Sequence, residues 1–338
     1  MRIPLNDDFH FWTASEFLCR DFTIEKEEDV TGGGLLPRRA KAIIGGVSKI
    51  GKSLLCLEWA LSLISGKPFL IQFPIPKSFR VAMLQGEISE KSMQERILKT
   101  TANDPQLERS LTNLFLLNNK TLKLDSPRDL KLLSEELEKI NPDVFILDPL
   151  YKFHRGDENK TTDMVRFFDA FDTLLDRHNM SGILVHHFGK PTETKRDGAQ
   201  QLRGSSTIFD VGDSYLILNR ISAREGKSYF KISFELRNDE DPAPLYIHRN
   251  PETLRHEVLD EETEEKLTIT QIVKTVRAMG GSARKGDLIR RLETDTGLSG
   301  RSVRDIVDRA ITVGRVYERP LLIESHSKGR PTTEIYIL

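Results

Sequence analysis

The feature that most constrains this chain is a glycine-rich loop between two apolar stretches. Residues 46–53 read G-x-x-x-x-G-K-S, with the strand-like run 42–44 before them and the helical pattern 54–64 after them. Glycine lets a backbone approach an anion closely and present successive N–H groups to it. The positive end of the following helix faces the same anion. The loop is therefore predicted to cradle nucleotide phosphates, with a plain Gly-Lys turn as the alternative.

The motif also predicts which residues touch the nucleotide. The Lys52 ammonium would reach the β- and γ-phosphates, and the Ser53 hydroxyl would hold Mg2+ beside bound ATP. The predicted nucleotide-binding residues are Gly46, Val47, Ser48, Lys49, Ile50, Gly51, Lys52, Ser53 and Leu54.

Composition places the chain among globular proteins. It has 338 residues, of which 30% are charged and 38% hydrophobic, enough for a large core and two domains. Its two cysteines, Cys19 and Cys56, lack metal-ligand spacing, which favours a reduced setting. The first residues lack the apolar stretch of a signal peptide, and the apolar run 54–64 is too short to span a bilayer. A cytoplasmic protein is expected.

Apolar strands alternate with helices along the first two thirds of the chain. Strands are predicted at 80–84, 114–117, 144–148 and 182–185, and helices at 91–101, 127–140 and 164–177. This alternation predicts an α/β fold with an open, mainly parallel sheet and flanking helices. Ligands of such sheets lie at the carboxyl ends of the strands, so side chains just past those ends should converge on one edge. These side chains are Lys52, Glu87, Asp148, His186 and His187.

Changes in composition suggest four segments. Residues 1–40 are predicted to be an N-terminal extension and residues 41–256 the α/β domain. Residues 257–265 hold six acidic residues in nine positions and are predicted to be a solvated linker. Residues 266–338 would form a second domain, with 14 Lys and Arg against 8 Asp and Glu, although the whole chain has a net charge of −1.

The C-terminal segment shows three helical runs followed by a possible hairpin. The helices are predicted at 269–279, 284–292 and 301–313, and the hairpin strands at 317–324 and 333–338. This order predicts a small winged helix-turn-helix domain. Its basic residues would meet duplex DNA through the third helix and the wing, or a protein partner instead. The candidate DNA-binding residues here are Arg301, Arg304, Lys328 and Arg330.

Several motifs together resemble one family. The segments are GLLPRRAKAIIGGVSKIGKS, LQGE, VFILDPLYKFHRGDENKTTDM, LVHHFGK and LRGSS. In this order they resemble the RepA-like branch of RecA-fold P-loop ATPases, which is related to the DnaB-type hexameric helicases. The resemblance covers roughly residues 30–250 and leaves the predicted winged helix outside. It implies a RecA-like sheet, ATP and Mg2+.

The resemblance implies roles for the residues at the strand ends. Glu87 matches the family's catalytic glutamate, Asp148 the aspartate that holds Mg2+, and His186 or His187 the γ-phosphate sensor. Hydrolysis needs such groups to position water and to neutralise charge on the phosphates. Simpler interpretations are a surface acid for Glu87 and ordinary polar residues at a strand end for the histidines.

Ring ATPases of this kind take an arginine finger from the neighbouring subunit. The DnaB-type helicases place it in a K-x-R pair after a late strand, and the matching position here reads Glu235-Leu236-Arg237. Arg237 is therefore the first candidate although the lysine is missing, and Arg203 in LRGSS is the second.

The polar segment 188–201 stands where RecA-type folds place DNA-binding loops that face the ring centre. The basic residues that would contact phosphates of single-stranded DNA there are Lys190, Lys195 and Arg196. Such contacts weaken as salt rises and do not depend on the DNA sequence. An ordinary solvated loop is the alternative.

The sequence thus predicts a Mg2+-dependent ATPase that forms a homo-oligomeric ring, expected to be a hexamer. It would act as a DNA helicase or translocase in replication or repair. The alternative is an ATP-gated DNA-binding replication initiator, loader or regulator with slow hydrolysis.

Overall fold

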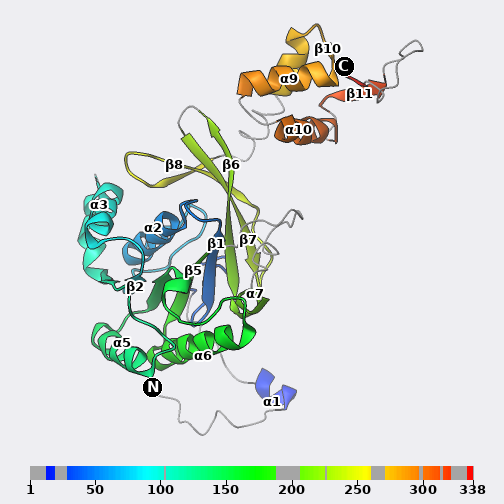
Figure 1. Cartoon of the computed structure of the whole chain (residues 1–338). Coiled ribbons are helices and arrows are strands. Elements are labelled where there is room, and N and C mark those ends of the chain that lie inside the picture. The colour runs from blue at the N-terminus through cyan, green and yellow to red at the C-terminus, as the bar shows by residue number, and fades with distance from the viewer. Residues whose placement is uncertain are drawn as a thin grey trace. The chain divides into compact units, whose positions relative to one another are not determined.

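The structure is a computed structural model that describes residues 13–19, 29–102, 104–187, 206–224, 227–259, 271–296, 300–312, 315–320 and 333–337. The chain divides into two compact units (Figure 1). Residues 1–244 and 248–257 form the first, and residues 245–247 and 258–338 form the second.

The larger sheet has nine strands in the order β3-β2-β4-β5-β1-β6-β7-β8-β9, and all of them but parts of β8 and β9 belong to the first unit. The strands are β1 (Lys41–Gly46), β2 (Val81–Gln85), β3 (Leu114–Asn118), β4 (Val144–Asp148), β5 (Ser181–His187), β6 (Ser214–Arg224), β7 (Lys227–Leu236), β8 (Leu245–Arg249) and β9 (His256–Leu259). Every pairing from β3 through β6 is parallel, and β6 pairs with β7 antiparallel. The predicted mainly parallel α/β sheet is confirmed.

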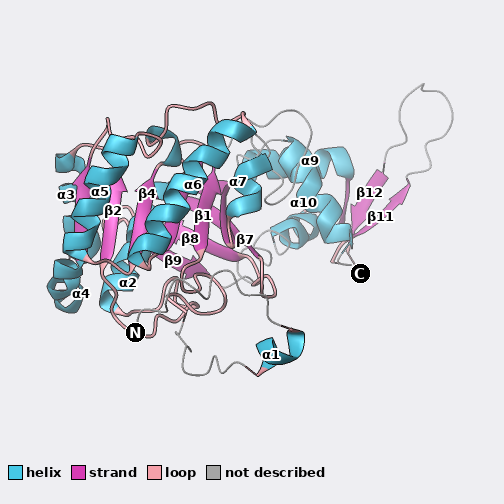
Figure 2. Ribbon diagram, turned by 90° about the horizontal axis from the view of Figure 1, so that it is seen from below, coloured by secondary structure: helices cyan, strands magenta, loops and turns pink. Residues whose placement is uncertain are grey.

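Helices cover both faces of this sheet. They are α2 (Lys52–Ser65), α3 (Glu90–Thr101), α4 (Pro105–Ser110), α5 (Pro127–Ile140), α6 (Thr161–His178) and α7 (Ser206–Val211), with a short α1 (Ala14–Leu18). Because parallel crossovers are right-handed, the strand order places α2 on one face and α5, α6 and α7 on the other. Figure 2 shows α5, α6 and α7 across one face of the sheet, and contacts join α5 to α6 and α6 to α7. None of the helices in the described part of the chain combines the length and apolar character that a membrane crossing needs.

Aromatic rings fill the core on the α6 face. Phe167 and Phe171 lie on one stripe of α6, are fully buried and stack with ring centroids 6.2 Å apart. Phe171 also meets Phe145 of β4 at 6.1 Å. Burying such rings is the main free-energy gain of this layer, at roughly 2–3 kcal/mol for each side chain. This packing, with Gly182 of β5 against the Phe171 ring, fixes α6 on β4 and β5, the strands that end in Asp148 and His187.

The predicted strand 182–185 is longer in the structure, because β5 continues through both histidines. β5 lies between β1 and β4, and His186 and His187 are in register with Gly45 and Gly46 of β1. A central strand continues for as long as a neighbour can pair with its backbone. The two histidines therefore lie within the strand end rather than past it.

The second unit contains three helical segments and a three-stranded sheet. A helix spans residues 271–278, and β10 (Ser282–Arg284), α9 (Lys285–Thr296), α10 (Gly300–Thr312), β11 (Tyr317–Pro320) and β12 (Thr333–Tyr336) follow. The sheet order is β10-β12-β11, and β12 is antiparallel to both neighbours. Its core includes the buried side chains Val276, Leu288, Val307 and Ile335. The three-residue strand β10 is an addition to the predicted elements.

A buried carboxylate ties the turn between β8 and β9 to α2. Glu58 is the one charged residue in the middle of α2, and its Oε2 atom accepts hydrogen bonds from the backbone N of His256 at 3.0 Å and from the His256 ring Nδ1 at 2.6 Å. Arg255 also lies 4.0 Å from Glu58 Oε1. An unpaired buried carboxylate would be costly, so this contact holds the β8–β9 turn on the helix that leaves the glycine-rich loop.

We expect replacement of Glu58 by Ala to lower the free energy of unfolding by about 3 kcal/mol, because it leaves two buried donors of His256 unpaired. Urea denaturation followed by circular dichroism measures the change. The matched control is Glu136→Ala, whose carboxylate is mostly exposed and should contribute less than about 1 kcal/mol. Equal losses in the two variants would contradict the anchoring role of Glu58.

Candidate functional site: the phosphate loop and the strand ends

The glycine-rich loop has the backbone that its sequence predicts. β1 runs into it and α2 leaves it, as Figure 1 shows. Gly51 has a φ of 113°, a left-handed conformation that favours glycine, and forms the N-cap of α2. A Cβ on Gly46 would lie 2.7 Å from the carbonyl oxygen of Leu218 in β6, so no larger residue fits there without a shift. Gly51 thus allows the turn into α2, and Gly46 allows the close approach of β1 to β6.

Lys52 folds back onto its own loop. Its Nζ atom donates hydrogen bonds to the carbonyls of Gly46 and Val47 at 2.8 Å each, and lies 3.0 Å from Nδ1 of His187. Burial lowers the pKa of Lys52 to about 8, against the opposing attraction of Asp148 and Glu87. A phosphate in the loop would offer this ammonium a stronger, oppositely charged partner.

Asp148 ends β4 as a fully buried carboxylate. Its Oδ1 atom accepts from the Ser53 hydroxyl at 3.0 Å, and its Oδ2 atom accepts from Nε2 of Gln85 at 2.7 Å. Burial raises the pKa of Asp148 to about 6, while these two hydrogen bonds act in the opposite direction. The site therefore contains a desolvated carboxylate and a hydroxyl side by side at the first turn of α2.

Glu87 follows β2 and is partly exposed. Its Oε1 atom accepts from the Tyr151 hydroxyl at 2.5 Å and lies 4.0 Å from Nε2 of His187. Burial and then this bond to Glu87 raise the pKa of Tyr151 to about 12. A Cβ on Gly86 would lie 2.8 Å from Cβ of Lys152, so glycine lets the chain after β4 come close enough for Tyr151 to reach Glu87.

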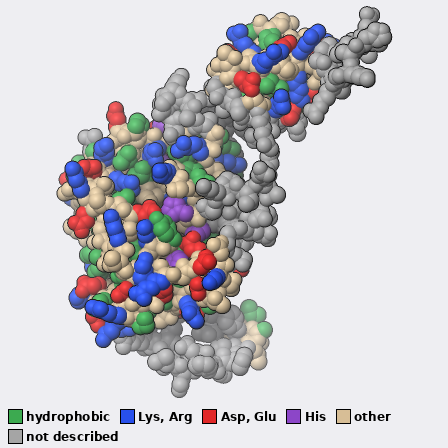
Figure 3. All heavy atoms as spheres, in the orientation of Figure 1, with side chains coloured by type: hydrophobic (Ala, Val, Ile, Leu, Met, Phe, Trp, Pro, Cys, Tyr) green, Lys and Arg blue, Asp and Glu red, His purple; other side chains and the backbone are tan. Residues whose placement is uncertain are grey.

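The two histidines of β5 have different surroundings. His187 lies between Lys52 and Glu87, and burial followed by the Lys52 charge lowers its pKa. His186 lies beside Glu158 instead: its Nδ1 atom is 3.8 Å from Oε1 of Glu158, and burial lowers its pKa to about 4. Figure 3 shows histidine side chains beside acidic ones near the middle of the visible face of the first unit. Of the two candidate sensors, His187 is the one in contact with the phosphate loop.

The structure does not bring Arg237 to this group. The backbone N of Arg237 donates to the carbonyl oxygen of Asp213 at 2.9 Å. The backbone N of Asp213 in turn donates to the carbonyl oxygen of Lys41 at 2.8 Å. Lys41 begins β1 and Gly46 ends it, so Arg237 lies at the opposite edge of the parallel strands, where its guanidinium pairs with Asp213 at 3.5 Å.

Other candidates lie elsewhere. Arg301 and Arg304 are in α10, and the Arg304 side chain is exposed. The candidates outside the described residues are Arg203, Lys190, Lys195, Arg196, Lys328 and Arg330.

Two residues at the site were missed in the sequence. Gln85 bridges Asp148 and the turn of Glu87, because its Oε1 atom accepts from the backbone N of Glu87 at 2.7 Å. Tyr151 holds the Glu87 carboxylate. The signal for Gln85 was available, since a single amide side chain ends an otherwise apolar, fully buried strand. No local pattern marks Tyr151.

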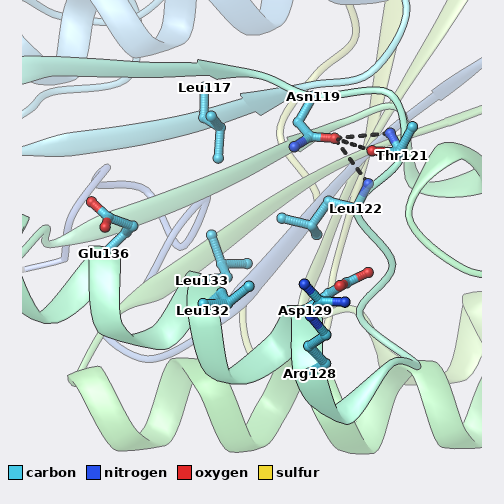
Figure 4. Close-up of a pocket in the computed structure, with 9 residues that line it drawn as sticks. All are labelled: Leu117, Asn119, Thr121, Leu122, Arg128, Asp129, Leu132, Leu133 and Glu136. Atoms are coloured by element: carbon cyan, nitrogen blue, oxygen red, sulfur yellow. Dashed lines mark hydrogen bonds between the residues drawn. The ribbon is translucent and has the colours of Figure 1, made fainter.

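A separate hollow lies between the edge strand β3 and α5 (Figure 4). Asn119 shapes its rim, because Asn119 Oδ1 accepts hydrogen bonds from the backbone N atoms of Thr121 and Leu122. Leu117 and Leu132 expose apolar surface there. The lining residues are Leu117, Asn119, Thr121, Leu122, Arg128, Asp129, Leu132, Leu133 and Glu136, and none belongs to the group around Lys52.

Nucleotide binding at this site should take up a proton in mildly alkaline solution. The pKa of Lys52 is about 8, and the charge of a bound phosphate raises it. At a pH between this value and the higher pKa of the nucleotide-bound lysine, binding therefore protonates the amine. We expect an uptake of more than about half a proton per ADP at about pH 8.5 and much less at about pH 7. Calorimetric titrations in two buffers with different ionisation enthalpies measure the uptake.

The same titration with Lys99→Ala serves as the control, because Lys99 is an exposed residue of α3 and should leave the uptake unchanged. Proton release, or an uptake that does not depend on pH, would contradict the contact between Lys52 and phosphate.

Comparisons with known proteins agree with this geometry. The family model AAA_25, described as an AAA domain, matches residues 13–193, which is more than half of the chain. Among solved structures, one described as an ATPase domain is similar with a TM-score of 0.55 and 12% identity, over 73% of this chain and 98% of that one. A DnaB-like replicative helicase, described with its interactions with primase, is similar with a TM-score of 0.50 and 13% identity, over 66% of this chain.

This chain spans 58% of the DnaB-like helicase chain. The search of the curated proteins found no match. At such low identities the two solved structures show a shared fold, and the parallel sheet with its flanking helices fits a RecA-like arrangement. With the family model covering more than half of it, the chain belongs to the AAA domain family and is a nucleotide-binding protein with the RecA fold of P-loop ATPases.

Proposed function

We propose that the protein is an ATP-dependent DNA helicase or translocase of the RepA-like type, which acts as a homo-oligomeric ring in DNA replication or repair. The observation that carries this proposal is the convergence of Lys52, Ser53, Asp148, Glu87 and His187 at one edge of the sheet. The family match and the fold shared with a DnaB-like helicase support it.

The chain's own residues would divide the work of hydrolysis among them. Lys52 would exchange the carbonyls of Gly46 and Val47 for the β- and γ-phosphates of ATP. Once the Glu87 carboxylate is free of its hydrogen bond from the Tyr151 hydroxyl, it would orient the attacking water and accept a proton from that water. His187, which touches both Lys52 and Glu87, would report the state of the γ-phosphate to the segment that follows β5.

The residues present fit a magnesium ion. Mg2+ prefers oxygen ligands and keeps water and substrate phosphates in its shell, so it needs only one or two protein ligands. Ser53 Oγ and the Asp148 carboxylate supply them, and the burial of Asp148 favours a cation beside it. Among the described residues no group of three or more His, Cys, Asp or Glu could hold a metal by itself. When bound with ATP, Mg2+ would neutralise charge on the phosphates.

The ring and the arginine finger belong to the same proposal. A finger acts across a subunit boundary, so Arg237, at the far edge of its own sheet, remains a candidate only for the site of a neighbouring subunit. Arg203 is the other candidate. We propose a hexamer, with Lys190, Lys195 and Arg196 on single-stranded DNA in the ring centre.

The second unit supplies a further proposed contact with nucleic acid. The order of a helix, β10, α9, α10 and the antiparallel pair β11–β12 fits a winged helix-turn-helix. In that arrangement α10 would be the recognition helix, with Arg301 and Arg304 near its start and Lys328 and Arg330 between the hairpin strands. A protein partner is the alternative ligand for this basic unit.

One observation favours a slower, switch-like role. The catalytic candidate Glu87 is held by Tyr151 at 2.5 Å, and Lys52 is held by its own loop, so both groups must change partners before hydrolysis. An ATP-gated DNA-binding initiator, loader or regulator would use such a site as a timer.

ATP turnover with and without single-stranded DNA tests the function. We expect ATP hydrolysis stimulated by single-stranded DNA, a ring-sized species in the presence of a non-hydrolysable ATP analogue, and a loss of about 100-fold or more in turnover for Glu87→Gln with nucleotide binding retained. The matched control is Glu90→Gln, an exposed acid at the start of α3.

Slow turnover that DNA does not change would support the switch instead. Turnover of Glu87→Gln at the parent rate would remove Glu87 from the catalytic residues.

Duplex DNA binding tests the second unit. We expect Arg301→Ala with Arg304→Ala in the full chain to weaken duplex binding by about tenfold or more at low salt and to flatten its salt dependence, because two phosphate contacts are lost. Fluorescence anisotropy with a labelled duplex measures both. The ATP turnover of this variant without DNA should match the parent. Unchanged duplex binding would point to a protein partner for α10.

A further inference from the structure

One arginine reaches the phosphate loop, and two arginines from other elements of the first unit lie near it. Arg249 ends β8, and its Nη1 atom lies 3.0 Å from the position that a Cβ on Gly51 would take, one residue before Lys52. The Arg249 side chain thus reaches the loop that joins β1 to α2. Arg220 of β6 and Arg96 of α3 lie close enough for their charges to lower the pKa of Arg249, after the larger effect of burial.

This arginine cluster, Arg96, Arg220 and Arg249, has excess positive charge. Both of the charged groups that shift the pKa of Arg249 are cations. Within the described ranges of the chain, no carboxylate forms an ion pair with any of the three guanidiniums. A half-buried cation with two further cations near it is costly unless an anion joins it, so the cluster has the charge of an anion site.

Two of the three guanidiniums share one aromatic ring. The Cζ atoms of Arg220 and Arg249 lie 5.9 and 5.8 Å from the centroid of the same buried ring, Phe230. Cation–π contact favours this placement. The contact of Glu58 with His256 fixes the turn that follows β8. Such preorganisation reduces the entropy cost of binding a ligand.

The cluster is largely separate, in its electrostatics, from the group that faces the β- and γ-phosphates. No arginine contributes to the lowered pKa of Lys52 or of His187. Arg96 does lower the pKa of Asp148, but as the smallest of the causes that act on that carboxyl. Arg249 approaches the loop one residue before Lys52 instead. Arg249 therefore meets the loop at a residue whose carbonyl Lys52 Nζ does not contact.

We infer that Arg249, which shares the Phe230 ring with Arg220, is a nucleotide ligand supplied by the same chain, and that it binds the α-phosphate of a nucleoside di- or triphosphate. This inference rests on the nucleotide site of the proposed function and adds a residue to it. Arg249 differs from an arginine finger, because a finger acts from another subunit on the charge that develops at the γ-phosphate. An α-phosphate ligand serves ADP and ATP alike.

The test compares the affinities of ADP and of a non-hydrolysable ATP analogue for variants of the full chain, measured by displacement of a fluorescent ADP. We expect Arg249→Gln to weaken both affinities by about tenfold or more, since a hydrogen-bonded charge pair is lost. Arg249→Lys should be intermediate, because lysine keeps the charge without the planar fork. Arg177→Gln is the matched control, an exposed arginine in the last turn of α6, and should bind as the parent does.

Two outcomes overturn the inference. Unchanged ADP affinity in Arg249→Gln, with a melting temperature near that of the parent, would leave Arg249 without a role in binding. A loss confined to the ATP analogue would move its contact to the γ-phosphate. If Arg249→Gln fails to fold, Arg220→Gln takes its place, with a weaker affinity for both nucleotides expected.

The proposed function is checked separately in the same assay. Parent protein that binds no nucleotide, or Lys52→Ala that binds as the parent does, would contradict the nucleotide site itself. Parent binding that is lost in Lys52→Ala but kept in Arg249→Gln would contradict only the role of Arg249.

Discussion

The lysine of the phosphate loop is the point on which this site depends. Its ammonium is buried beneath two loop carbonyls and a histidine, and burial lowers its pKa to about 8. A cation in this position is only partly compensated by Asp148 and Glu87. The surroundings of Lys52 are therefore short of negative charge, and a polyphosphate would supply that charge.

The rest of the fold holds this lysine among its partners. β1 and β5 run in parallel to the same edge, so the loop and His187 meet there. β4 and β2 bring Asp148 and Gln85 to that edge, and Gly86 lets the chain after β4 approach the turn of Glu87. Glu58 ties the hairpin of β8 and β9 to the same helix that Lys52 begins. One sheet edge thus collects groups that lie more than a hundred residues apart in the chain.

The sequence predicted the parallel sheet and the convergence at its edge, because apolar runs of strand length and the glycine loop are local signals. It predicted β5 too short, since the pairing of His186 and His187 with β1 depends on a neighbouring strand. It also could not choose between these two histidines, whose side chains face different partners only in the folded sheet.

Contacts between residues distant in sequence could not be predicted either, because they too depend on how the strands pair and pack. Tyr151 meets Glu87 only because Gly86 allows a close approach, and Arg249 of β8 meets Gly51 only through its long side chain. Gln85 is different, because a lone amide in a buried strand is a readable signal.

The most direct test of this account is a crystal structure of the chain with a non-hydrolysable ATP analogue and Mg2+. The account predicts that Lys52 Nζ leaves the carbonyls of Gly46 and Val47 for the β- and γ-phosphates, with Ser53 and Asp148 next to the metal. A bound nucleotide with Lys52 still on those carbonyls, or a nucleotide bound away from the loop, would contradict it.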